Sequence, residues 1–268
     1  MYIRLLCILV LVAASYVSIN VVSAAPTITD VTIVISAQVA EVYDATGLLN
    51  GQVQVGDTVT GQYTYDLLTP NTSSHPQVGD YWHYEPPNGL VVQVSGLIFQ
   101  TDPDHIEFLV ELVDNHNADN YLVRSYRNLP LSRGVLVRHI AWQLDDPSMT
   151  ALSTIALPAI EPDLADWQSI FGLTLEGCSE SLSTPGECGD FDFFIRAHVT
   201  SATRQYCPSF VPPATVGIED IVAMATRWGW TNTTPGWDTA YDLNGDNKID
   251  IVDISLVTRA WGRTCSSP

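Results

Sequence analysis

Oxygen-bearing residues recur at a regular spacing near the C-terminal end of this chain of 268 residues. Between residues 242 and 253 they occupy positions 1, 3, 5, 9 and 12, and position 7 can supply its main-chain carbonyl. Hard oxygen ligands at this spacing allow one loop to wrap a single calcium ion, whereas Mg²⁺ gives up its waters reluctantly. We therefore predict one Ca²⁺ site with the ligands Asp242, Asn244, Asp246, Lys248 through its main chain, Asp250 and Asp253.

Two positions of this loop depart from the usual calcium loop. Position 6 is Asn247 where glycine is usual, and Asn tolerates a left-handed backbone better than most residues. Position 12 is Asp253, which is shorter than the usual Glu. Ile249 at position 8 is apolar, as expected for a loop that packs onto its own core. The alternative interpretation is a chance acidic turn.

A helix is expected after the loop, because apolar residues recur at helical spacing from Ile251 to Trp261 and Gly262 then ends the run. The same residue types occur 33 positions earlier in the chain. The matching pairs are Val216 with Ile249, Asp220 with Asp253, Ile221 with Ile254, Trp228 with Trp261, and Gly229 with Gly262.

This duplicated loop–helix unit, in which both helices end in Trp-Gly, resembles a type I dockerin over about residues 207–265. The resemblance implies a small α-helical module with EF-hand-type loops. It also implies a cohesin-like protein as partner, in bacterial cell-surface assemblies that break down polysaccharide. The alternative partner is the chain's own β-rich domain. The residues that would contact a cohesin are Ile218, Glu219, Ile251, Val252 and Arg259.

The first copy of the unit lacks most of the ligands. Its positions 1, 3, 5 and 9 are Ser209, Val211, Pro213 and Gly217, and Asp220 is the one acid that remains. The chain is therefore expected to bind one calcium ion and not two.

The first 24 residues are typical of a secretory signal peptide. A short start with one positive charge, Met1–Arg4, precedes an apolar run of about 13 residues, and small residues follow at 22–24. A membrane anchor is the alternative, but a span needs about 20 apolar residues. We expect a secreted, extracellular or cell-surface-associated protein with no membrane insertion.

Residues 25–206 are expected to form a mostly β domain. Short runs rich in Val, Ile, Thr, Tyr and Phe are separated by turn residues such as Asn50-Gly51, which predicts an antiparallel β-sandwich or a jelly-roll-like fold. The segment 55–66 and the segment 157–165 resemble a β-rich module of exported bacterial proteins that has no assigned activity. A proline-rich segment, 207–213, marks the boundary with the C-terminal module.

Four cysteines follow the signal peptide, and an even number in an exported chain indicates disulfides. Three pairings are possible, and their positions favour Cys178 with Cys188 and Cys207 with Cys265. No Cys/His cluster suggests a zinc site.

The composition and the motifs narrow the classes of function. The chain has 30 acidic and 11 basic residues, a net charge of −19, which disfavours binding to nucleic acid or to anionic membranes. Residues 25–206 contain no GxSxG, HExxH or phosphate-binding loop. The acidic loop Asp114–Asn120 could hold a cation or only form turns. The aromatic residues Tyr81, Trp82 and Tyr84 could stack on sugar rings or pack over the end of a sheet.

These observations favour a secreted, non-catalytic protein that binds or displays through its β-rich domain and is anchored by a calcium-stabilised tail. The alternative is a carbohydrate-active enzyme, such as a glycoside hydrolase, whose β-rich domain is catalytic. Such a site needs two carboxyl groups about 5–10 Å apart across a cleft.

Overall fold

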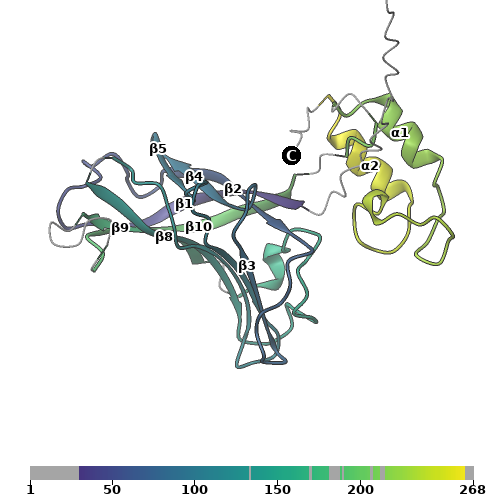
Figure 1. The fold of residues 1–268 in the computed structure, drawn as a ribbon. Coiled ribbons are helices and arrows are strands. Elements are labelled where there is room, and N and C mark those ends of the chain that lie inside the picture. Colours follow the sequence, from purple (N-terminus) through teal and green to yellow (C-terminus); the bar gives the residue numbers. More distant parts are fainter. Residues whose placement is uncertain are drawn as a thin grey trace, which may run out of the picture.

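The computed structural model describes residues 30–132, 134–168, 171–180, 188, 190–205, 208–211 and 215–262. The predicted signal peptide, Cys207, Pro213 and Cys265 lie outside these residues. The described chain is mostly β (Figure 1), which confirms the predicted class. Its strands are β1 (Asp30–Asp44), β2 (Thr58–Asp66), β3 (Val78–His83), β4 (Gly89–Val94), β5 (Leu97–Gln100), β6 (Phe108–Val113), β7 (Asp119–Ser125), β8 (Val135–Asp146), β9 (Phe171–Ser179) and β10 (Phe193–Arg204).

All ten strands belong to one curled antiparallel sheet, in the order β3-β6-β7-β8-β9-β10-β1-β2-β4-β5. The predicted sandwich would have two separate sheets. The sheet is continuous because β1, with 15 residues, pairs with β10 along one edge and with β2 along the other. The two halves therefore face each other while they remain hydrogen-bonded through β1.

The core lies between these two halves. Alternate residues of β1, such as Val31, Ile33 and Ile35, are almost fully buried, as the period of a strand requires. Across the core, the hydroxyl of Tyr63 on β2 lies 2.9 Å from that of Tyr121 on β7. Large buried side chains from distant strands thus hold the curl closed.

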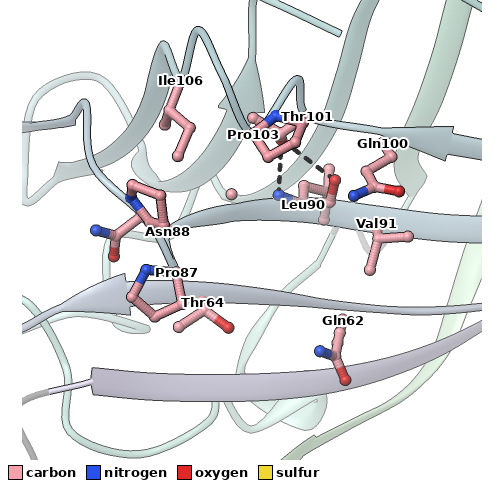
Figure 2. A pocket seen from close by; sticks show the side chains of 12 residues that line it. Gln62, Thr64, Pro87, Asn88, Leu90, Val91, Gln100, Thr101, Pro103 and Ile106 are labelled. Carbon is pink, nitrogen blue, oxygen red and sulfur yellow. Dashed lines mark hydrogen bonds between the residues drawn. The ribbon is translucent and has the colours of Figure 1, made fainter. Parts of the chain in front are cut away.

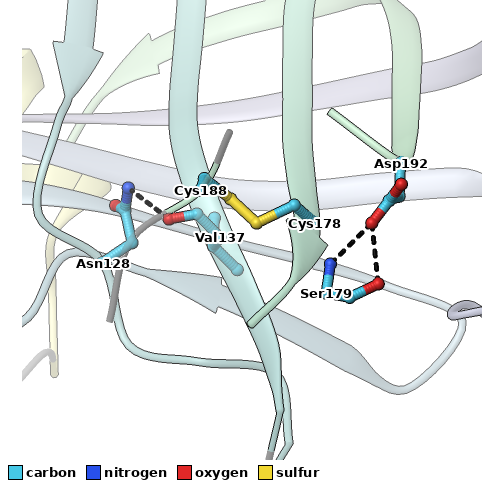
Figure 3. Close-up of a disulfide and its surroundings, with 6 residues drawn as sticks. All are labelled: Asn128, Val137, Cys178, Ser179, Cys188 and Asp192. Carbon is cyan, nitrogen blue, oxygen red and sulfur yellow. Dashed lines mark hydrogen bonds between the residues drawn. A yellow bond between two sulfur atoms is a disulfide. The ribbon is translucent and has the colours of Figure 1, made fainter. Parts of the chain in front are cut away.

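A disulfide joins Cys178, near the end of β9, to Cys188, which precedes β10 (Figure 3). Their Cα atoms are 5.7 Å apart, within the range for an unforced bridge. Asp192 accepts hydrogen bonds from the amide and the hydroxyl of Ser179 beside it. This predicted pairing is confirmed, whereas the predicted Cys207–Cys265 bridge lies outside the described residues.

The two α-helices follow the strands in the chain: α1 (Ile218–Ala225) and α2 (Ile251–Arg259), with the short 3-10 helix η2 (Thr239–Tyr241) between them. Another 3-10 helix, η1 (Leu164–Asp166), precedes β9. In Figure 1 the helices lie to one side of the sheet, and they have a small hydrophobic core of their own. The buried members of this second core are Val216, Met224, Tyr241, Leu243, Ile249, Leu256, Val257 and Ala260.

A hydrogen bond joins the strand region to the helical region, in which the Arg204 guanidinium donates to the carbonyl of Leu243 at 3.0 Å. Within the described residues, no helix is long and apolar enough to cross a membrane.

Candidate metal-binding loop

The segment Asp242–Asp253 connects η2 to the first turn of α2. It starts at the C-cap of η2, Asp242, whose backbone N–H donates to the Thr239 carbonyl, and Asp238 caps the other end of η2. Its end is set by a reciprocal cap on α2, in which Asp250 is the N-cap and the Asp253 side chain accepts from the Asp250 amide at 2.8 Å. The loop thus runs from the C-terminal end of η2 to the first turn of α2.

The Asp242 carboxylate organises the first half of the loop. It accepts hydrogen bonds from the amides of Gly245 at 2.9 Å, Asp246 at 3.2 Å and Asn247 at 2.8 Å. Burial raises the pKa of Asp242, and repulsion from Asp253 and Asp246 adds to the rise, although two of these amide bonds oppose it. The loop therefore concentrates negative charge around Asp242.

Asn244 and Asp246 lie against this group. The Asn244 amide donates to the Asp246 carboxylate at 3.1 Å, and the amide N–H of Lys248 donates to Asp246 at 2.9 Å. The structure thus brings together three of the predicted ligands: the Asn244 side chain contacts that of Asp246, and the Asp246 amide donates to the Asp242 carboxylate.

Asp253 joins the end of the loop to its beginning. Its side chain is fully buried and accepts from the amides of Leu243 at 2.7 Å and Asn244 at 3.3 Å. Asp250 points to the helix start, where it accepts from the Val252 amide at 2.8 Å. The sixth predicted ligand, Lys248, forms a β-bridge with Thr231.

The backbone of the loop has the features that ion wrapping requires. Asn247 has a φ of 65°, the left-handed conformation expected at position 6. Ile249 is fully buried in the second core, as expected at position 8. Within the described residues, no three His, Cys, Asp or Glu side chains are gathered as a metal site. The fit to calcium therefore rests on the set of oxygen donors and on the path of the loop.

The hydrogen bonds of the loop recur 33 residues earlier. Asp220 is also buried, and it accepts from the amides of Phe210 at 2.5 Å, Val211 at 3.0 Å and Gly217 at 2.8 Å. These donors are the counterparts of Leu243, Asn244 and Asp250.

The two copies also pair with each other. The Gly229 amide donates to the carbonyl of Ile249, and the Gly262 amide donates to that of Val216, each at 2.9 Å. The structure thus shows an internal two-fold arrangement in which the second copy keeps the acidic loop and the first keeps only Asp220.

The acidic loop Asp114–Asn120 is explained by turn formation. Asp119 is fully buried and accepts from the amides of Asn115 at 2.9 Å and Leu152 at 2.8 Å. Hydrogen bonds from Ser148 and Thr150 hold the pKa of the neighbouring Asp146 well below its ordinary value. These carboxylates are occupied by the backbone, so the turn interpretation is the better one.

A shallow hollow of about 220 Å³ lies over β2 and β4, next to the loop that contains Pro87 and Asn88 (Figure 2). Thr101 lines this hollow, and its hydroxyl accepts a hydrogen bond from the Leu90 amide at 2.8 Å. No Asp, Glu, His, Cys, Lys, Arg or Tyr lines this hollow. Its polar side chains among the described residues are the amides of Gln62, Asn88 and Gln100 and the hydroxyls of Thr64 and Thr101.

The aromatic residues singled out in the sequence separate onto two faces. Tyr81 is buried in the main core and its hydroxyl donates to the Ile155 carbonyl at 2.7 Å, so the idea that it stacks on sugar is wrong. Its neighbours Trp82 and Tyr84 point to the opposite face of the sheet, and Tyr84 is 61% exposed. Alternation along the strand produces this separation.

Comparisons of the chain with protein-family models, with curated proteins and with solved structures found no match.

Proposed function

We propose that this is an exported, non-catalytic binding and anchoring protein whose residues 207–265 form a calcium-stabilised, dockerin-like module. Residues 25–206 are the β-rich binding domain in this proposal. The observation that carries it is the loop Asp242–Asp253, in which oxygen donors at calcium-loop spacing surround a left-handed Asn247 and a buried Ile249. The two-fold hydrogen bonding of Asp220 and Asp253 supports the duplicated unit.

A bound calcium ion supplies positive charge to a loop of closely placed acids. This chain's own residues hold the loop ready: Asp253 closes it from inside the small core, and the Asp250 cap orients α2. Because a core of this size contributes little stability alone, ion affinity becomes folding stability. At free calcium about 100-fold above the dissociation constant, the gain is about 2.7 kcal/mol.

Exposed apolar residues support anchoring to a partner. Ile218 and Ile251, which are related by the 33-residue offset, are 55% and 63% exposed, and Trp228 and Trp261 are 53% and 56% exposed. Repeated apolar patches on a small helical unit mark a protein-binding surface. We propose a cohesin-like protein as the partner. The alternative partner is the chain's own β-rich domain, and the hydrogen bond from Arg204 to Leu243 is the observation that supports this alternative.

Export is supported by the apolar N-terminal segment and by the Cys178–Cys188 disulfide, because disulfides persist in oxidising compartments. We therefore propose a location outside the cell or at its surface, and the dockerin resemblance alone suggests a link to polysaccharide breakdown.

One observation favours a carbohydrate-active enzyme as the second candidate. Asp80 and Glu111 are directly opposite on β3 and β6, and burial and the charge of Asp80 raise the pKa of Glu111. A paired carboxyl group with a raised pKa, next to Trp82, is a candidate acid. Hydrolysis of a polysaccharide that Glu111→Gln abolishes would support this candidate, and binding without hydrolysis would support the first.

Thermal unfolding with calcium and with chelator tests the main proposal. We expect two transitions, of which only the one belonging to residues 207–265 moves to lower temperature when calcium is removed. Because Trp82, Trp142 and Trp167 lie in the strand region, peptide-resolved hydrogen exchange, rather than a tryptophan signal, is used to assign each transition to its region. Superimposable curves under both conditions would refute the calcium-stabilised module.

A further inference from the structure

The sheet presents a second face that the core does not use. We define the outer face as the side chains that point away from the buried core on β3, β6, β7, β8, β9, β10 and the last residues of β1. Two groups of aromatic rings stand on it, one at each side. Large apolar groups exposed together on a sheet face mark a binding surface more often than isolated ones do.

The first ring group comprises Trp82, Tyr84 and Tyr126. The Trp82 ring centroid lies 6.4 Å from that of Tyr84, with planes within 10°, and 5.4 Å from that of Tyr126. Tyr84 and Tyr126 are 61% and 36% exposed. Leu109 on β6, directly opposite Trp82, is 5% exposed on the outer face, so the group has an apolar floor.

The second ring group comprises Tyr43, Phe191 and Phe194. Tyr43 and Phe194 stack with centroids 5.3 Å apart, and Phe191 meets Phe194 edge-on at 5.5 Å. Tyr43 and Phe191 are 44% and 40% exposed. The Arg196 guanidinium lies 4.6 Å from the ring centroid of Phe194 and holds it from one side.

A row of side chains that crosses the strands connects the two groups. His139, Glu176, Phe194 and Tyr43 are successive partners on β8, β9, β10 and β1. Tyr126 follows Ser125, which is paired with Ile140, so it lies beside His139 at the other end of the row. With strands about 4.8 Å apart, Tyr126 and Phe194 are about 14 Å apart along this row.

Polar groups between and around the rings lie in close pairs. His139 lies 3.2 Å from Glu176, Arg127 lies 3.2 Å from Glu107, and Arg196 lies 3.0 Å from Glu41. The outer face thus offers both hydrogen-bond donors and acceptors.

We propose that the outer face binds a neutral polysaccharide that lies across the strands from Tyr126 to Tyr43. Each aromatic group stacks on the apolar C–H face of a sugar ring, and the His139–Glu176 pair between them meets sugar hydroxyls, which both donate and accept. This inference names the ligand class of the proposed binding domain, and it rests on the proposal that residues 25–206 bind.

The pattern favours a neutral sugar over other ligands. An anionic polymer would be repelled by Asp80 and Glu111 beside Trp82, and Arg127 and Arg196 are paired with Glu107 and Glu41. A protein partner would favour one continuous apolar patch, but here a polar pair separates the two ring groups.

Retention of the full chain on insoluble neutral polysaccharides, namely cellulose, chitin, xylan and starch, tests the inference. We expect retention on at least one of them, insensitive to 0.5 M salt, about the level at which surface charge attraction is largely screened. The double variant Tyr126→Ala/Phe194→Ala removes one ring from each group and should bind at least tenfold more weakly. Leu68→Ala removes an exposed apolar side chain outside the face and should bind as the unaltered chain does.

Three outcomes would overturn the inference: no retention of the folded chain on any of the four, retention that the double variant does not weaken, or salt-sensitive retention on polygalacturonate alone. A dimer in sedimentation that the double variant converts to monomer would also overturn it, because the face would then be an interface between copies. Thermal unfolding of the same samples with and without calcium tests the anchoring module separately, so a failure of that module can be told apart from a failure of polysaccharide binding.

Discussion

Asp253 and Asp220 are buried carboxylates that accept hydrogen bonds from equivalent backbone amides, 33 residues apart, and we expect them to have different roles. Each accepts three amide hydrogen bonds, but only Asp253 follows a loop rich in oxygen donors. Comparing variants of the two residues therefore distinguishes a contribution to folding stability from a contribution to ion binding.

Asp253→Asn should lower calcium affinity at least tenfold and also lower the stability of the calcium-free tail. Asp220→Asn should lower that stability by a similar amount, about 1–3 kcal/mol, and leave calcium affinity unchanged. Calorimetric titration and thermal unfolding of both variants would check this. Equal loss of calcium affinity in the two variants would argue against a single site.

Glu111 gives a pH dependence whose sign can be worked out. Burial and then Asp80 raise its pKa above 4.5, so the folded state favours the protonated carboxyl, and the stability of the strand region falls as pH rises through that raised value. Glu111→Gln should remove this loss, so the variant gains stability relative to the unaltered chain at pH 7 compared with pH 4. Unfolding at both values of pH measures it, with the exposed Glu85→Gln as control. A gain of the same size in that control would contradict the assignment.

At this scale the sequence could predict residues defined by spacing. Asn247 and Ile249 have the conformation and the burial that their positions in the loop indicate. Tyr43, Tyr126 and Phe194 could not be found this way, because lone aromatics in strands are ordinary and only the sheet register brings β7 and β10 onto one face.

At the scale of elements, the Cys178–Cys188 bridge closes a short connection between two neighbouring central strands, β9 and β10. Loop-closure entropy for a separation of 10 residues gives about 2–3 kcal/mol.

Cys178→Ala/Cys188→Ala should therefore lower the stability of the strand region by about 2–3 kcal/mol. The calcium-dependent transition of the tail should not move. Denaturant unfolding followed in the far ultraviolet checks the first point. Simultaneous loss of the tail transition would show that the two regions unfold as one unit.

Strands with clear alternation were predictable, as in β1, β2 and β8, whereas β3 and β9 were not. Both contain a glycine where a neighbour packs closely: a Cβ on Gly79 would lie 2.6 Å from the Ile155 carbonyl oxygen, and one on Gly177 would lie 2.3 Å from that of Leu136. Glycine weakens the local strand signal, and β2 remains predictable despite its own close-packed Gly61 because β-branched and aromatic residues alternate around it. Helices α1 and α2 lie in the segments where apolar residues recur at helical spacing.

At the scale of the whole molecule, alternation tells which residues face a core but not which strands pair. A sandwich of two sheets was therefore expected, and the 15-residue β1 makes one curled sheet instead. The small second core around Met224 and Val257 shares no buried member with the large one, which agrees with separate unfolding of the two regions.

Calcium binding to the intact chain, measured by equilibrium dialysis with metal analysis, tests the central claim most directly. We expect one calcium ion per chain, loss of that ion in Asp242→Ala/Asp246→Ala, and full retention in Glu219→Gln, which removes a tail charge outside the loop. Absence of bound calcium at millimolar concentration, or binding that the double variant leaves intact, would contradict the account.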